Sequence, residues 1–388
     1  MMINNQNESP TSGIPILSFF TGGGFLDIGF EESGFSIVWT NEFNTALADM
    51  YESAMTVWRH SKDPMLQDAR ISSRFSITEL TPQGVMNDAF GSVRPPLFGV
   101  IGGPPCVDFS IGGKNQGANG FNGRLFRIFT DMIKELSPDF FVIENVPGLL
   151  KIGKHKSFLK RVIRGLKDKP HRYRVATKIV SALELGVPQN RERLFIIGFT
   201  DELVRASLRK HNTPDPVGWF IWPEAIYPDA RQLPWPTTSP FGGSPELPQG
   251  LPIQLTVNPL LAGPPDPETL PNGEESFKPY SAKFTQIEEG DDSRKSFKRL
   301  HRYRYSPTVW YGNNEVHLHP WKPRRLSVRE ALRIQTVPDT YVLPEEYPLT
   351  AKFRLIANGV PCKLAKAVAD SVKGFLPSST SERKLRLL

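Results

Sequence analysis

The stretch Ile16-Leu17-Ser18-Phe19-Phe20-Thr21-Gly22-Gly23-Gly24 decides the fold of this chain. Its mostly apolar first half predicts a buried strand, and its three glycines predict a tight turn from that strand into a helix. Short β-rich runs then alternate with amphipathic stretches as far as residue 200. The expected strands are Pro15–Phe20, Ser36–Thr40, Leu97–Ile101, Asp139–Ile143, Val175–Ser181 and Leu194–Phe199, and the expected helices between them are Phe43–Arg59, Gly123–Leu136 and Ser157–Leu166. This alternation predicts an α/β fold with a mixed, mostly parallel sheet and helices on both faces.

The glycine turn is a candidate ligand site. Glycines at this position let a ligand approach the backbone closely, and such turns bind dinucleotides or the amino-acid end of S-adenosylmethionine. Glu42 follows the second strand, where a carboxylate accepts bonds from ribose hydroxyls, and Phe43 beside it is placed to stack on an adenine. A G-x-G-x-x-G pattern would need glycine where Asp27 stands, which argues against NAD. Tight turns also use glycine for purely structural reasons.

Composition and charge limit the class of protein. The chain has 388 residues, 39% of them hydrophobic, which excludes wholesale disorder and suggests two or three domains. No apolar run is long enough to cross a bilayer, and the polar stretch Met1–Thr11 lacks a signal core, so we expect a cytoplasmic protein. Two cysteines cannot build a disulfide framework. The net charge of +7 permits nucleic-acid binding without demonstrating it.

The 36 prolines divide the chain. An average protein has about 5% proline, and this one has nearly twice that share, much of it between Pro214 and Pro279. Regular helices and central strands do not tolerate that density, so this region is expected to be irregular. We therefore predict a first segment of the α/β domain at 12–200, an irregular insert at 201–323, a return to the α/β domain at 324–376, and flexible tails at 1–11 and 377–388. The return contains two expected helices, Ser327–Gln335, which begins with a capping-box pattern, and Lys363–Lys373.

Three strand ends carry side chains suited to chemistry. Cys106 follows Gly102-Gly103-Pro104-Pro105, a rigid loop at the carboxyl edge of the sheet, where a nucleophile would be held and accessible. Glu144 ends a deeply buried strand, and partial desolvation would raise its pKa and make it a proton donor. Arg191 and Arg193 alternate before the last strand and could clamp a phosphate or a base carbonyl. Taken singly, a core cysteine, a helix-capping glutamate and an exposed strand edge remain alternatives.

Several short motifs of this sequence, taken in their order along the chain, resemble those of the DNA (cytosine-5) methyltransferases of bacterial restriction–modification systems. The matching segments are Phe19–Gly24, Pro104–Ser110, Gly123–Phe126, Glu144–Val146, Gln189–Arg193, Arg325–Glu330 with Gln335 and Pro338-Asp339, and Asn358–Pro361. The resemblance implies an S-adenosylmethionine-dependent, Rossmann-like methyltransferase fold with a smaller target-recognition domain in the Pro-rich insert. Three positions depart from the family pattern, namely Phe25, Ser76 and Ala357.

The resemblance also implies the roles of individual residues. Cys106 would add to carbon 6 of a flipped-out cytosine, Glu144 would protonate or hold ring nitrogen 3, Arg193 would bind the base carbonyl, and Arg191 would support the nucleophile's loop or the phosphate. The implied cofactor-binding residues are Phe20, Thr21, Gly22, Gly23, Gly24, Glu42, Phe43, Pro105, Asn358 and Val360. The implied DNA contacts are Ser110, Lys114, Arg299, Arg302, Arg304 and Thr308. The loop from Ser110 to Asn122 is glycine-rich and suits a mobile lid.

The implied reaction methylates carbon 5 of cytosine in a specific duplex DNA sequence, with S-adenosylhomocysteine as the second product and no metal. A restriction endonuclease would be linked in function without stable binding, and the enzyme would be a monomer. Two alternatives stay open. One is a related enzyme that methylates cytosine in tRNA, which the long insert disfavours. The other is a DNA-binding protein that has lost turnover, which the intact Cys106, Glu144 and Arg193 disfavour.

Overall fold

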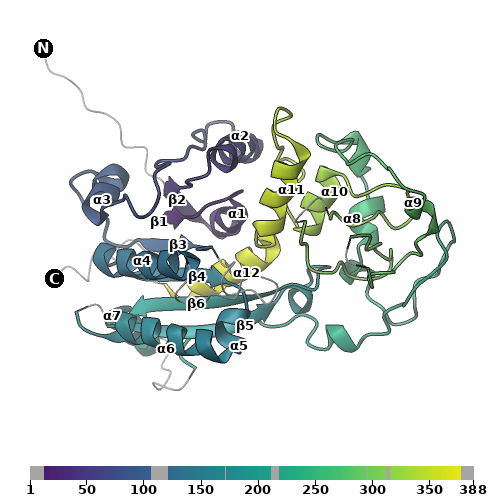
Figure 1. The fold of residues 1–388 in the computed structure, drawn as a ribbon. Helices are drawn as coiled ribbons and strands as arrows, with labels where there is room; N and C mark the ends of the chain where they lie inside the picture. The colour runs from purple at the N-terminus through teal and green to yellow at the C-terminus, as the bar shows by residue number, and fades with distance from the viewer. Residues whose placement is uncertain are drawn as a thin grey trace, which may run out of the picture.

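A six-stranded sheet forms the centre of the larger part of the molecule (Figure 1). The computed structural model describes residues 13–105, 121–170, 172–210, 218–294, 296–311 and 315–376. The strands lie in the order β2-β1-β3-β4-β6-β5. Their bounds are β1 Ile14–Phe19, β2 Phe35–Asn41, β3 Gly99–Gly102, β4 Phe140–Asn145, β5 Tyr173–Ser181 and β6 Glu192–Thr200. All six expected strands are therefore confirmed.

The sheet is mixed and mostly parallel, as predicted. β1 pairs in parallel with β2 and β3, and β3 pairs in parallel with β4. β6 runs antiparallel to both β4 and β5. The first residues of β6 consequently lie at the same edge of the sheet as the last residues of β4, with Leu194 opposite Asn145.

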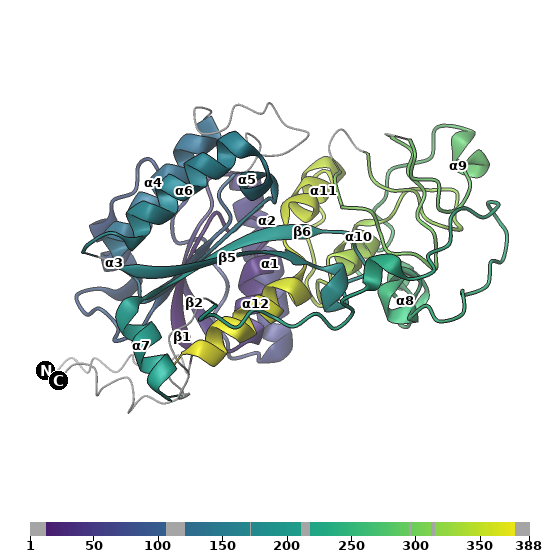
Figure 2. The same cartoon turned by 90° about the horizontal axis from the view of Figure 1, so that it is seen from below.

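Helices cover both faces of the sheet (Figure 2). α4 and α6 pack on one face through Phe129, Ile133 and Phe158, and α1, α7 and α12 pack on the other. The helices are α1 Phe25–Glu32, α2 Thr45–Lys62, α3 Pro82–Phe90, α4 Phe121–Leu136, α5 Gly148–Lys151, α6 Gly153–Lys167, α7 Asp201–Lys210, α8 Asn258–Ala262, α9 Lys283–Gln286, α10 Val328–Ile334, α11 Leu349–Asn358 and α12 Cys362–Phe375. Among the described residues, none of these helices has the length and apolarity needed to cross a bilayer.

Elements that follow residue 200 also pack on the sheet. Leu203 and Val204 of α7 lie in the core on one face of the sheet, and the Phe220 ring packs on Phe199. α7 packs there because it is amphipathic and buries its apolar side on the sheet. The predicted domain bounds stay predictions. The irregular part, here called the Pro-rich lobe, comprises residues 223–325.

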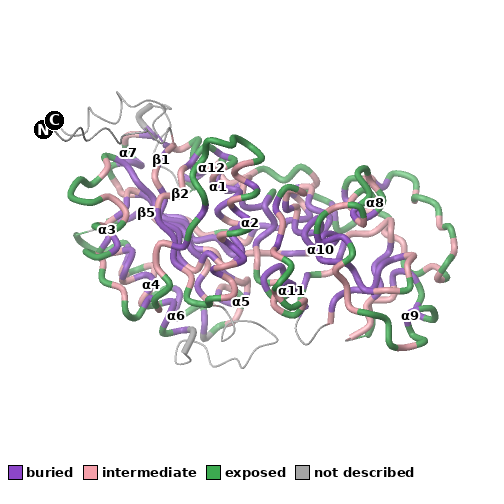
Figure 3. Tube along the Cα trace, turned by 90° about the horizontal axis from the view of Figure 1, so that it is seen from above, coloured by how far each residue is buried: buried purple, intermediate pink, exposed green. Residues whose placement is uncertain are grey.

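The Pro-rich lobe lies beside the sheet domain, with α10 and α11 between the two (Figure 1). Its described residues contain no named strand and only short helices. These are α8, α9 and the 3-10 turns Ala230–Gln232, Ile253–Leu255 and Pro267–Thr269. The most continuous buried stretches of the chain follow the central strands and α10 (Figure 3). A core formed by α1, α2, α10 and α11 also includes Val257, Leu300 and Val316 of the lobe.

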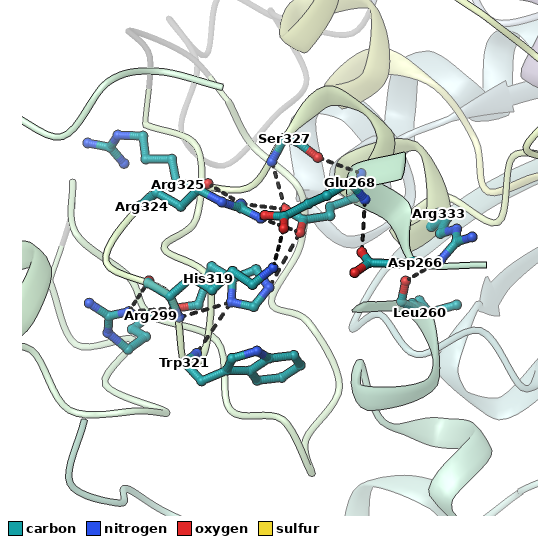
Figure 4. Close-up of polar contacts among 12 residues, drawn as sticks. Leu260, Asp266, Glu268, Arg299, His319, Trp321, Arg324, Arg325, Ser327 and Arg333 are labelled. Carbon is teal, nitrogen blue, oxygen red and sulfur yellow. Dashed lines mark hydrogen bonds and ion pairs between the residues drawn. The ribbon is translucent and has the colours of Figure 1, made fainter. Parts of the chain in front are cut away.

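A buried ionic cluster fastens the lobe to α10 (Figure 4). Ser327 and Glu330 form the predicted capping box, and Glu330 is fully buried. The Arg324 guanidinium donates to both Glu330 oxygens at 2.8 and 2.7 Å, and His319 Nε2 lies 3.4 Å from Glu330 Oε1. A buried carboxylate of this kind is tolerated because it is paired and hydrogen-bonded.

Candidate functional site

Three strand ends meet at the carboxyl edge of the parallel strands. Gly102 of β3 lies between Phe19 of β1 and Ile143 of β4 in the sheet register. Because β6 is antiparallel, its first residues reach the same edge from the opposite direction. The glycine turn after β1, the loop after β3, Glu144 and Arg193 are therefore brought together.

The loop after β3 is held by the next strand. The buried Asn145 side chain donates from Nδ2 to the carbonyl oxygen of Pro104 at 3.1 Å. A Cβ atom on Gly103 would lie 3.0 Å from Glu144 Oε2, so glycine permits this close approach. Pro105 is the last residue described before the predicted nucleophile. Cys106, Ser110 and Lys114 lie outside the described residues, as does most of the predicted lid.

Glu144 and Arg193 form an ion pair at this edge. Arg193 Nε lies 2.8 Å from Glu144 Oε1, and the two side chains are only 13% and 12% exposed. Burial raises the pKa of Glu144 above its ordinary value, and the charges of Arg193 and Arg191 offset part of that rise. A carboxyl group with a raised pKa, close to the loop of a thiol, can donate a proton to a bound base.

Arg191 connects the site to distant parts of the chain. Its buried guanidinium donates from Nη2 to the carbonyl oxygens of Ala357 and Gly359 at 2.8 and 2.7 Å, and from Nη1 to Val309 at 3.2 Å. These contacts tie β6 to the last motif and to the Pro-rich lobe. Support of the nucleophile's loop by Arg191 stays a prediction.

The glycine turn has the geometry of a ligand cradle. Gly22 and Gly24 have φ angles of 53° and 76°, which favour glycine, and a Cβ atom on Gly24 would come within 2.7 Å of the Tyr51 ring. Gly22 N donates to Glu42 Oε2 at 2.9 Å, so the carboxylate lies against the turn. Burial raises the pKa of Glu42, while backbone bonds from Asn44 and Gly22 oppose the rise. Next to it, the Phe43 side chain is 67% exposed.

The other expected cofactor residues differ in burial and contacts. The Phe20 ring packs edge-on against Phe129, and Thr21 N donates to the Asn41 carbonyl at 3.1 Å. Asn358 ends α11 and is exposed, whereas the Val360 side chain is 5% exposed and belongs to the core. A cofactor contact by any of these residues stays a prediction.

The departures from the family pattern have different surroundings. Phe25 is buried, and its ring occupies the space beside Gly359, where a Cβ atom would lie 2.1 Å from it. It therefore packs the last motif against α1 rather than pointing into solvent. The Ser76 hydroxyl lies 2.9 Å from the Thr78 hydroxyl at the surface. Ala357 is partly buried, and its carbonyl receives the bond from Arg191.

Two residues that sequence reasoning missed support the glycine turn. The buried Tyr341 hydroxyl donates to the Gly23 carbonyl oxygen at 2.8 Å, across 318 positions of sequence. Asp27 accepts from Ser18 Oγ at 2.7 Å and from the Tyr51 hydroxyl at 3.0 Å, and burial raises its pKa to about 7. The sequence contains no local signal for the first contact. For the second, the sequence shows that Asp27 departs from a dinucleotide pattern, but not that it accepts hydrogen bonds from Ser18 and Tyr51.

The structure contradicts the expected DNA contact of Arg299. Its side chain is 1% exposed and donates to the carbonyl oxygens of Ile287, Phe284, His319 and Lys322. The guanidinium therefore holds the lobe together instead of facing a phosphate.

The other expected DNA contacts in the lobe stay predictions. Arg302 is bound through Nε and Nη2 to Glu289 at 2.8 Å, and Arg304 lies 3.8 Å from Asp292. Thr308 is exposed, and its hydroxyl donates to the Asn190 carbonyl, which places it beside Arg191.

Comparison with known proteins agrees with this geometry. The family model of the C-5 cytosine-specific DNA methylases matches residues 14–234 and 260–374. The type II methyltransferase M.NmeDI of Neisseria meningitidis serogroup C is 41% identical over 95% of this chain and 86% of its own length. M.MthTI of Methanothermobacter thermautotrophicus is 29% identical over 92% of this chain and 96% of its own length. The crystal structure of an E. coli prophage protein, described as a DNA modification methyltransferase, shares the fold with a TM-score of 0.62 and 20% identity. The match covers 94% of this chain and 99% of that protein.

Proposed function

The chain belongs to the C-5 cytosine-specific DNA methylase family, and we propose that it methylates carbon 5 of a flipped-out cytosine within one duplex DNA sequence. S-adenosylmethionine is the proposed methyl donor, and a type II restriction–modification system is the proposed setting, as the name of the relative M.NmeDI suggests. The observation that carries the proposal is the Glu144–Arg193 pair beside the loop that leads to Cys106.

The proposed chemistry begins at Cys106. Carbon 5 of cytosine is a poor nucleophile, and addition of the Cys106 thiolate to carbon 6 turns the ring into an enamine with electron density at carbon 5. Glu144, with its raised pKa, delivers a proton to ring nitrogen 3 as the thiolate adds. Arg193 then faces the base carbonyl and stabilises the negative charge that develops on the ring. After methyl transfer, loss of the carbon 5 proton expels Cys106 and restores the aromatic ring.

The residues around the glycine turn fit the proposed donor. The space beside Gly22 is open and leaves room for an amino-acid moiety. The Glu42 carboxylate has remaining lone pairs for ribose hydroxyls, and the exposed Phe43 ring offers a surface for adenine. S-adenosylmethionine supplies an electrophilic methyl group when bound. The target base lies inside a duplex stack, so its extrusion into the site is part of the proposal.

The test measures both methyl transfer and the DNA sequence that is methylated. Plasmid DNA from cells that express the protein should contain 5-methylcytosine at one short sequence in bisulfite sequencing. Cys106→Ser should abolish the methylation while the purified variant still binds duplex DNA. Methyl transfer to tRNA alone would refute the DNA proposal, and full activity of the serine variant would refute the covalent mechanism.

A further inference from the structure

The positive charge of the protein is concentrated in one short segment outside the Pro-rich lobe. Residues 151–174 contain ten Lys and Arg and a single acidic residue, Asp168, which gives a net charge of +9. The whole chain has a net charge of +7 from 47 basic and 40 acidic residues, so the remainder has 37 basic and 39 acidic residues and a net charge of −2. The excess is a local property of this segment.

Helix α6 presents this charge on one side. Four basic residues of α6 recur at intervals of four, four and three positions, which places them along one face of the helix: Lys156, Lys160, Arg164 and Lys167. They span about 16 Å at 1.5 Å per residue. The opposite side of α6 packs Phe158, Leu159 and Leu166 into the core. We define the basic face by seven exposed side chains, five on α6 and two just after it: Lys156, Lys160, Arg161, Arg164, Lys167, Lys169 and Arg172.

The basic face is not neutralised by the protein itself. Within the described parts of the chain, none of its seven side chains forms an ion pair with a carboxylate, although neighbouring cations do. Lys151 pairs with Glu192 at 2.8 Å and Arg174 with Asp201 at 2.6 Å. Unpaired like charges at helical spacing repel one another and destabilise a helix slightly. A face that keeps them is suited to a polyanion.

The position of α6 connects the basic face with the proposed active site. α6 follows β4 and α5, so it begins near the edge of the sheet where Glu144 lies, and it lies beside α4 on one face of the sheet (Figure 2). At its far end, a hollow is lined by basic and acidic side chains, namely Lys167, Lys169, Arg172 and Arg205 with Asp168 and Asp201. Asp201 pairs with Arg174 and Arg205, not with the basic face. Among the described residues of 151–174 there is no exposed large apolar side chain, which disfavours a membrane surface.

We propose that the basic face of α6 binds the phosphate backbone of duplex DNA outside the recognised sequence. This inference rests on the proposed function, because it takes the partner to be the DNA substrate. Lysine and arginine contacts to phosphates fix position without reading sequence. The basic face therefore supplies sequence-independent affinity, while the Pro-rich lobe and the catalytic edge engage the target.

The experiment compares two charge-matched triple variants of the full chain. K156Q/K160Q/K167Q removes three lysines of the basic face, and K62Q/K363Q/K373Q removes three exposed lysines of α2 and α12. Both variants lose three positive charges, so an effect of net charge alone would be the same in each. Binding to a fluorescently labelled duplex of arbitrary sequence is measured by anisotropy over a range of salt concentrations, and thermal unfolding verifies that both variants are folded.

The basic-face variant should bind this duplex more weakly, and its plot of log affinity against log salt should be less steep by about 2.7, at about 0.9 for each lost phosphate contact. The control variant should keep the wild-type slope. Equal slopes for both variants would overturn the proposal, and so would loss of tRNA binding without loss of DNA binding. Methyl transfer by the wild-type enzyme to plasmid DNA is scored separately, so failure of the proposed reaction is distinguishable from failure of this surface.

Discussion

Removing one oxygen atom from Tyr341 should weaken cofactor binding. In the wild type, the Tyr341 hydroxyl donates to the Gly23 carbonyl at 2.8 Å, and the ring packs edge-on against Phe25 with 5.6 Å between centroids. Tyr341→Phe keeps the ring contact and creates no appreciable cavity. The variant therefore isolates the hydrogen bond that fixes the glycine turn.

The magnitude follows from the burial of both partners. A neutral hydrogen bond contributes about 0.5–1.5 kcal/mol net, and a buried carbonyl left without its donor costs about 1–3 kcal/mol. We expect the free energy of unfolding to fall by about 1–2 kcal/mol. If much of this loss reflects freedom of the turn that a ligand must remove, the Kd for S-adenosylhomocysteine should rise roughly three- to tenfold, since about 1.4 kcal/mol corresponds to a factor of ten.

Tyr311 provides the matched control. Its side chain is 3% exposed and lies in the same core as Tyr341, but among the described residues its hydroxyl has no hydrogen-bond partner. Tyr311→Phe should therefore leave both stability and ligand affinity unchanged or slightly improved. Titration calorimetry with S-adenosylhomocysteine and urea unfolding would be measured on both variants. An affinity of Tyr341→Phe within twofold of wild type, together with lower stability, would refute the link between this bond and the cofactor.

Three further predictions concern buried polar groups. Asn145→Ala removes the donor to Pro104 and should slow single-turnover methyl transfer at least tenfold, because a displaced reactive group loses rate steeply; an unchanged rate would contradict this. Glu144→Gln should reduce the transfer rate by about 10²–10⁴ and remove any decline of the wild-type rate at alkaline pH, measured as a pH profile, whereas a decline that persists would point to another acid. Burial alone would raise the pKa of Glu330, but the bonds from Arg324 and His319 lower it, so this residue stabilises the fold above its ordinary pKa of 4.5 and progressively less below it. The difference in urea midpoint between wild type and Glu330→Gln should thus shrink between about pH 7 and about pH 3.5, and a constant difference would disprove the assignment.

Local patterns predicted the elements of the sheet, because each central strand is a short apolar run between turn residues. They did not predict that β6 is antiparallel, since the direction of a strand leaves no mark on its apolar pattern. That reversal is what brings Arg193 to Glu144. The sequence therefore placed both residues at strand ends, but their contact depends on the topology.

Contacts between distant segments account for most of what was missed. Tyr341 and Gly23 lie 318 positions apart, and neither has a neighbour that signals the other. Arg299 was misjudged for a related reason. The sequence shows that Arg299 carries a charge, but it does not show that the side chain points inward or that the neighbouring Arg302 binds Glu289.

The high proline content of the lobe gives a physical reason for its arginines that donate to backbone carbonyls. The described residues of the lobe include no named strand, which leaves many backbone carbonyls without a ladder partner, and each proline removes one backbone donor. Arginine offers five N–H donors and can satisfy several carbonyls at once. Arg325 donates to Ser296 and Val316, and Arg333 to Leu260 and Pro265, just as Arg299 bonds four carbonyls. These cations hold the Pro-rich lobe in shape, so its arginine content overstates the charge available to DNA. The seven side chains of the basic face form no ion pair with any described residue and remain available for phosphates.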